Sequence, residues 1–158
     1  MKIKKIFIIF AIFILLTGCT KTDTEEKEKT KYQKYVKSLE QVSESTEKLP
    51  FDVNVEYDKM SKNEIRYQVI IDNPKEDLND IEAIAIHNMQ TDDIFPNIGI
   101  FDKKESLKKN KKPSGIILVG YIPYSGKIKE LDCTIKVLIK YTDKEKSDVV
   151  YYVTKNDE

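Results

Sequence analysis

The chain has 158 residues, enough for one domain with a connecting segment and too few for two large domains. Its 27 basic and 27 acidic residues balance, so it lacks the basic excess that marks a nucleic-acid-binding domain. Arg66 is the single arginine, which leaves lysine to supply nearly all of the positive charge. We therefore expect no nucleic-acid partner.

The N-terminus has the parts of a bacterial export signal in their usual order. Three lysines within the first five residues precede an uninterrupted apolar run from Ile6 to Leu16. A run of this length fits the core of a signal peptide and falls short of the roughly 20 apolar residues that span a bilayer. The following tetrapeptide, Leu16-Thr17-Gly18-Cys19, resembles the lipobox of bacterial lipoproteins, in which a signal peptidase cuts before the cysteine.

This resemblance implies that residues 1–18 are a lipoprotein signal peptide and that Cys19 carries a diacylglyceryl anchor. One acyl chain gives only marginal membrane binding, whereas two chains anchor a protein stably. We therefore expect the mature protein to lie on the extracytoplasmic face of the cell membrane. With Cys19 lipidated, Cys133 is the one remaining cysteine, and no intramolecular disulfide is expected.

The first part of the mature chain is predicted to be a tether followed by a helix. In the predicted tether, residues 19–31, every residue after Cys19 is Thr, Lys, Asp or Glu, and such residues bury too little surface to order themselves. This segment is therefore predicted to be flexible and disordered. Residues 32–48 predict a short amphipathic helix, which either packs on the domain or continues the stalk. Its apolar face consists of Tyr32, Tyr35, Val36, Leu39 and Val42.

From Phe51 onward the hydrophobic period is two residues, which is typical of strands with one buried face. Residues 115–122 are apolar on both faces and are therefore predicted to form a central strand. The longest alternating run places Ile135, Val137 and Ile139 toward the core. The expected strands are 51–57, 65–71, 81–87, 98–101, 115–122, 131–141 and 149–153.

About seven strands with turn signals between them and little helix predict an all-β fold, an antiparallel β-sandwich. The pattern is similar to that of immunoglobulin-like domains, although the paired cysteines and buried tryptophan of antibody domains are absent. The predicted organisation is a signal peptide over 1–18, a tether over 19–31, a helix over 32–48 and the β-sandwich over 51–158.

The residues that most often carry catalysis are scarce. His87 is the only histidine, whereas hydrolytic triads need a base held by a third group and zinc sites need three or four ligands. We interpret it as a strand-end residue with ordinary hydrogen bonds. Cys133 alternates in phase with Leu131 and Ile135, which predicts a buried and inert thiol. No cofactor and no enzymatic activity are expected.

Two charged segments, an acidic turn and a lysine-rich loop, are candidate binding sites. The turn after residue 71 offers carboxylates for calcium, with Asp72, Asp77 and Asp80 as weak candidate ligands, but its spacing departs from that of an EF-hand loop. Solvated turn residues are the favoured interpretation. The loop over residues 103–112 is a candidate for contact with anionic lipid headgroups or wall polymers, and a merely solvated loop is its alternative. The lysines concerned are Lys108, Lys109, Lys111 and Lys112.

A third candidate is aromatic. Tyr121 and Tyr124 lie at a strand end, where tyrosines serve as binding anchors or cover the open end of a sandwich.

Together these features predict a lipid-anchored, non-enzymatic module that binds an envelope protein or a wall polymer, or that shields the membrane surface. A carrier of a small ligand or of calcium, using the acidic turn, is an alternative from a different class. An envelope enzyme that uses carboxylates and tyrosine is a third. A concave apolar pocket with convergent polar groups favours the carrier, and a flat exposed aromatic patch favours the interaction module.

Overall fold

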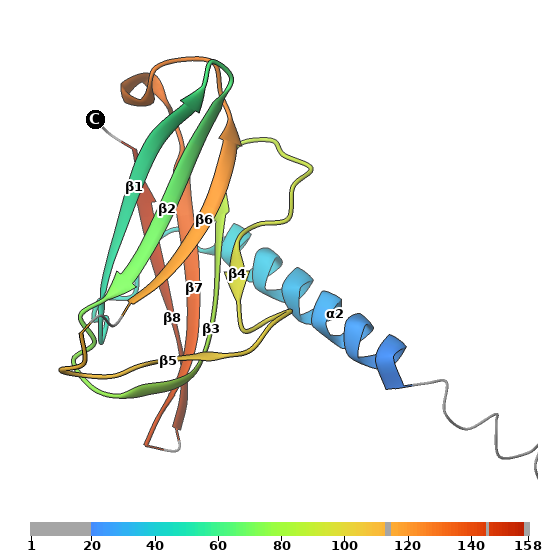
Figure 1. Ribbon diagram of the computed structural model, residues 1–158, viewed down its shortest axis with the longest axis vertical. Coiled ribbons are helices and arrows are strands. Elements are labelled where there is room, and N and C mark those ends of the chain that lie inside the picture. The colour runs from blue at the N-terminus through green and yellow to red at the C-terminus, as the bar shows by residue number, and fades with distance from the viewer. Residues whose placement is uncertain (1–19, 113–114, 145, 157–158) are drawn as a thin grey trace, which may run out of the picture.

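A computed structural model describes residues 20–112, 115–144 and 146–156. The described chain contains one α-helix followed by eight strands, which form two antiparallel sheets (Figure 1). The expectation of a mostly β structure built from antiparallel strands is confirmed. The predicted signal peptide, residues 1–18, and the lipid attachment residue Cys19 lie outside the described residues. Within those ranges, no helix combines the length and the hydropathy needed to cross a membrane.

The two sheets differ in size and in how they are covered. The first has the order β1-β2-β6, and the second has the order β4-β3-β7-β8, with β5 also pairing to β3. The strand β5 was not expected, because its three residues are too few to show a hydrophobic period. The bounds are β1 Asp52–Ser61, β2 Glu64–Asp72, β3 Leu78–His87, β4 Asn97–Ile98, β5 Glu105–Leu107, β6 Gly115–Pro123, a 3₁₀ turn Ile128–Glu130, β7 Thr134–Asp143 and β8 Lys146–Lys155.

The space between the sheets is filled by the side chains that the period of two assigns to it. Ile135, Val137 and Ile139 of β7 are fully buried in this core, as predicted. The strand β3 is buried on both faces, because Ala83 faces the core while Ile84 faces a second apolar cluster on the outside of the sheet. Leu39 of the helix completes that second cluster.

The strand β6 lies at the edge of its sheet, so the prediction that residues 115–122 form a central strand is wrong. Among the described strands it pairs only with β2, from Gly115 opposite Asp72 to Pro123 opposite Glu64. Alternate β6 residues are buried, and the residues between them are exposed although apolar. An apolar pattern on both faces does not distinguish a covered central strand from an edge strand whose outer face remains in water.

The helix α2, Thr20–Gln41, corrects two further predictions. Residues 20–31 are helical instead of forming a disordered tether, and the helix ends at Gln41 instead of extending to residue 48. Asp23 precedes Lys27 by four residues, a spacing at which opposite charges stabilise a helix. The C-terminal half of α2 packs its predicted apolar face on β3 and β7, and such packing supplies most of a helix's stability. Amino-acid composition alone reveals neither the charge spacing nor the packing that stabilises this helix.

The segment after α2 covers the free edge of β8. The Thr46 amide donates to the Tyr151 carbonyl at 2.8 Å, and the Tyr151 amide donates to Thr46 Oγ1 at 2.9 Å. Ser45 Oγ accepts from the Val153 amide at 2.9 Å in the same way. Backbone groups that a sheet edge usually leaves to solvent are therefore paired within this chain.

The buried position of Ile139 gives the first testable expectation. Replacing it by Ala should lower the free energy of unfolding by about 2–5 kcal/mol, because the deletion leaves a cavity in the core. Val149, which is 44% exposed on β8, provides a matched control whose replacement by Ala should change that free energy by roughly 0.5 kcal/mol or less. Urea unfolding followed by circular dichroism measures both. Equal losses in the two variants would contradict the assigned core.

Candidate functional site

The outer face of β6 carries the most concentrated exposed apolar surface of the described strands. Ile117 is 56% exposed, Val119 40% and Tyr121 45%, and the three residues alternate with buried neighbours along one strand. In the pairing with β2, Tyr121 stands opposite Arg66 and Val119 opposite Gln68. We call the side chains of Ile117, Val119 and Tyr121 the β6 stripe.

The outer face becomes polar toward β1. Asp58 Oδ2 accepts a hydrogen bond from Arg66 at 2.6 Å and another from Gln68 at 3.3 Å. These polar side chains pair with one another on the sheet surface next to the β6 stripe, although Arg66 Nε has no hydrogen-bond partner among the described residues. The first sheet therefore has an apolar margin along β6 and a charged margin along β1.

Tyr124, the second aromatic candidate, is held in place by its own domain. Its hydroxyl donates to the Glu130 carbonyl at 2.8 Å. Lys59 Nζ donates to the Tyr124 carbonyl at 2.9 Å and lies 5.7 Å from the centre of its ring. These contacts make Tyr124 part of the closure of the sandwich end, whereas Tyr121 stays exposed.

Glu82 of β3 is the charged residue most deeply buried in the described chain, 2% exposed. Tyr35 Oη of α2 donates to Glu82 Oε2 at 2.6 Å, and Lys104 Nζ lies 2.8 Å from Oε1. Lys31 of α2 approaches the same oxygen at 3.3 Å. The carboxylate thus joins the helix, β3 and the segment before β5.

Burial by itself raises the pKa of Glu82, but the hydrogen bonds from Lys104 and Tyr35 and the charge of Lys31 outweigh it and hold that pKa below its usual range. Burial and the adjacent carboxylate raise the pKa of Tyr35, so its phenol keeps the proton that it donates. Glu82 was not among the candidate residues expected from the sequence. One feature of the sequence could have indicated it: Glu82 is an acidic residue on the same strand face as Ile84 and Ile86, which are apolar.

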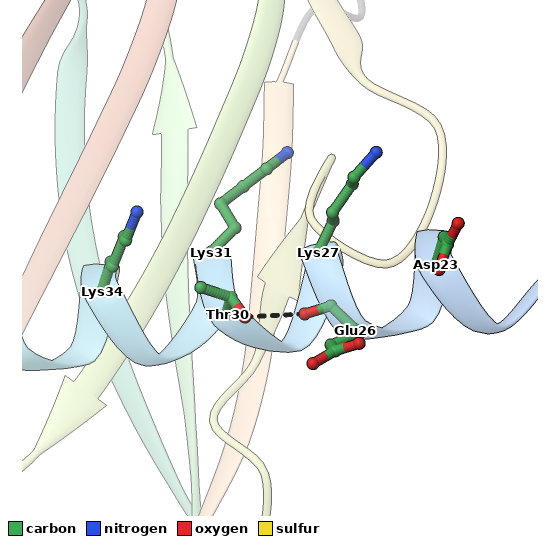
Figure 2. Close-up of a pocket in the computed structure, with 6 residues that line it drawn as sticks. All are labelled: Asp23, Glu26, Lys27, Thr30, Lys31 and Lys34. Atoms are coloured by element: carbon green, nitrogen blue, oxygen red, sulfur yellow. Dashed lines mark hydrogen bonds between the residues drawn. The ribbon is translucent and has the colours of Figure 1, made fainter.

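A shallow hollow runs along the exposed flank of α2 and is lined by residues of that helix alone (Figure 2). Lys27, Lys31 and Lys34 project from the same flank, while Thr30 Oγ1 donates to the Glu26 carbonyl at 2.8 Å. Lys31 is already engaged with Glu82. The side chains that line the hollow are charged residues of both signs and one threonine, and none of them is apolar. Such a lining is typical of a solvated helix surface and not of a ligand pocket.

His87 is a packing residue at the end of β3. Its ring stacks edge-on against Tyr67 and Phe95, with centroids 5.6 and 5.2 Å away. Its Nδ1 lies 3.1 Å from the Met89 carbonyl. Burial lowers the pKa of His87, and the carbonyls of Tyr121 and Met89 only partly oppose that effect, so the imidazole is neutral at pH 7.

Cys133 is fully buried, as its alternation predicted, and burial raises the pKa of its thiol to about 11. A thiol with this pKa is almost entirely protonated at neutral pH and is a poor nucleophile.

The lysine-rich loop and the acidic turn, predicted as separate candidates, face each other. Lys108 Nζ donates to Asn79 at 2.8 Å and lies 3.4 Å from Asp77, which also accepts from the Lys109 amide. Asp80 takes a left-handed backbone conformation, with a φ of 51°. Among the described side chains, no group of three or more His, Cys, Asp or Glu residues is arranged to hold a metal ion. The exposed remainder of the loop includes Lys111 and Lys112.

Comparisons with known proteins identify no family model, no curated protein and no solved structure that matches this chain. The function is therefore inferred from the physical features of the molecule itself.

Replacing Glu82 by Gln should lower the free energy of unfolding by about 1–3 kcal/mol at pH 7, because the charge-assisted hydrogen bonds weaken. The folded pKa of Glu82 lies below the unfolded value of about 4.3. Its stabilising contribution is therefore complete above that pH and is lost as the pH falls through the folded pKa. Urea titrations across this range should show the difference between wild type and variant shrinking as the solution becomes acidic.

The matched control for this variant is Glu40→Gln on the exposed side of the same helix. It removes the same charge without touching Glu82, and it should change the free energy of unfolding by roughly 0.5 kcal/mol or less. A Glu82→Gln deficit that stays constant from neutral to acidic pH would refute the assigned role of the charge.

Proposed function

We propose that this chain is an exported, lipid-anchored protein that uses a non-enzymatic β-sandwich to bind another macromolecule of the cell envelope. The observation that carries the binding role is the β6 stripe, three exposed apolar side chains on an uncovered strand. Contiguous exposed apolar surface on a domain is typical of an interaction site. The anchor rests on the lipobox-like sequence that ends at Cys19.

The strand order supports an immunoglobulin-like arrangement. In that fold, strands A, B, E and D form one sheet and C, F and G the other, to which variable-type domains add C′. Here β1, β2 and β6 take the positions of A, B and E, and β4, β3, β7 and β8 those of C′, C, F and G. The neighbouring pairs are antiparallel in both sheets.

The helix gives the proposed anchor a defined geometry. Thr20, the first residue of α2, directly follows Cys19, so the connection to the domain is a helix instead of a flexible tether. The half of α2 that precedes Tyr32 extends away from the sheets (Figure 1). At about 1.5 Å per residue this half is roughly 18 Å long, which would hold the β-domain a short and fixed distance from the membrane.

The buried polar groups support binding over catalysis. Glu82 is committed to holding α2, His87 is packed between two aromatic rings, and Cys133 is sealed in the core. Groups that do chemistry need access to substrate together with a shifted pKa. Glu82 and Cys133 have lost that access, and the His87 ring, at the edge of two surface hollows, is only 7% exposed and is engaged with the Met89 carbonyl.

The anchor is tested by growing cells with a clickable fatty acid and comparing Cys19→Ala with Cys133→Ala, each in the full chain. We expect the wild type and Cys133→Ala to be labelled and to enter the detergent-rich phase, because Cys19 carries the acyl chains. Cys19→Ala should be unlabelled. Persistent labelling of Cys19→Ala, or an unlabelled wild type, would show that the chain is not a lipoprotein.

A further inference from the structure

The outer edge of β6 is open although its inner edge is completely paired. All nine of its residues match β2 without a register shift. In an immunoglobulin-like sheet, strand D lies beyond the strand that β6 represents. The strand that precedes β6 here, β5, pairs instead with β3 of the opposite sheet. Within the described residues, no strand takes the position beside β6.

The chain protects its other edges and leaves this one unprotected. Edge strands usually carry charges, bulges or a cover that prevents pairing with another chain. The β1 edge carries Asp52, Glu56 and Asp58 and has a register shift near Lys59, and Ser45 and Thr46 cover β8. No charged residue occurs in β6 from Gly115 to Pro123. An uncharged, unbulged strand is a template for a further strand wherever its outer edge is uncovered.

The middle of β6 is its most accessible part. Near the C-terminal end, a hollow separates the loop containing Phe95 from Val119, Gly120 and Tyr121, and the carbonyl of Tyr121 interacts with His87. At the other end, β5 passes the start of the strand (Figure 1). Backbone groups of alternate residues point to the same side of an antiparallel strand, so Ile117 and Val119 direct theirs outward as Tyr121 does. The free backbone segment is centred on Ile117, which is also the most exposed of the stripe.

We propose that β6 pairs in antiparallel fashion with β6 of a second copy of this chain, about a two-fold axis at Ile117. The two three-stranded sheets would then form one continuous sheet, with Ile117 opposite its equivalent and Val119 opposite Gly115 of the other copy. This names the partner of the β6 stripe and so rests on the binding surface of the proposed function. An antiparallel strand paired with itself satisfies the two-fold symmetry of most homodimers.

The chemistry of the strand favours a second copy as occupant. Apolar residues meet apolar residues across the axis and no charge is brought opposite a like charge, which would destabilise the pair. Gly115 has no side chain, so Val119 of the other copy meets no side chain directly across the pair. Lipid anchoring would confine both copies to one membrane surface and raise their effective concentration, so a small interface suffices.

Disulfide formation in membranes tests the pairing and its axis. Three single variants of the full chain are oxidised with copper phenanthroline: Ile117→Cys, Val119→Cys and Tyr121→Cys. Equivalent residues at the axis are about 5.5 Å apart at Cα, within disulfide range, whereas two copies of Val119 are roughly 13 Å apart. Ile117→Cys should therefore give roughly tenfold more covalent dimer than either of the others. The wild type controls for Cys19 and Cys133.

A second variant tests the same pairing without an added thiol. Ile117→Lys places a charge at the axis opposite its equivalent and should convert a detergent-solubilised dimer into a monomer in light scattering. Val149→Lys makes the same change at an exposed position on β8 and should leave the dimer intact. Both side chains are exposed, so similar thermal unfolding of the two variants would confirm that folding is unaffected.

Several results would overturn the inference. Equal cross-linking at the three positions, stronger cross-linking at Val119 than at Ile117, or a monomeric wild type would each contradict pairing about Ile117. Cross-linking of Ile117→Cys to a different protein would reject the second copy while leaving the β6 stripe as a binding surface. Fatty-acid labelling of Cys19 is measured separately, so loss of the dimer and loss of the anchor are distinguishable.

Discussion

The carboxylate of Glu82 fixes how the helix lies on the β-domain. Moving a charge out of water costs several kcal/mol, and that cost is offset only if the charge finds good partners in the interior. Glu82 finds three, Tyr35 and Lys31 from α2 and Lys104 from the segment before β5. Apolar packing of Leu39 on β3 could tolerate small changes in the position of the helix. A hydrogen bond of 2.6 Å to a buried carboxylate cannot, because even a small shift would break it.

This arrangement makes the two sheets unequal. The helix covers the outer face of the β3 and β7 sheet, and Ser45 and Thr46 cover its β8 edge. The sheet of β1, β2 and β6 has no comparable cover among the described residues, and its outer face includes the β6 stripe. The same helix directly follows Cys19. One element would therefore both carry the anchor and protect one sheet, which leaves the opposite sheet to meet a partner.

The groups with shifted pKa values serve the fold. Burial lowers the pKa of His87 and raises that of Cys133, because both side chains are packed against their neighbours. Part of the positive charge of the lysine-rich loop is neutralised by the acidic turn, because Lys108 forms an ion pair with Asp77 and a hydrogen bond with Asn79. These internal pairs weaken both charged candidates. Within the part of the chain that the structure describes, the outer edge of β6 around Ile117 is the feature that pairs with no other strand.

Local patterns in the sequence were sufficient for the six longer strands and for the sides that they bury. They missed β5, and the strand expected over 98–101 is limited to Asn97–Ile98. A period of two placed Ile135, Val137 and Ile139 in the core, and spacings of three and four placed Leu39 on the packed face of a helix. Side-chain direction follows from the backbone geometry of a single segment, so neighbouring residues determine it. The same local reasoning identified Cys133 as a buried thiol.

What depended on distant residues was decided by the tertiary structure alone. The helix α2 lies where it does on the β-domain partly because Lys31 reaches Glu82, 51 residues away in the sequence. The strand β6 is an edge strand because β5 pairs with β3, a choice that no pattern within residues 115–122 contains. Whether an apolar face is covered depends on which segment arrives beside it. That arrangement is set by the packing of the whole chain, so the open edge of β6 could be recognised only once both sheets were in place.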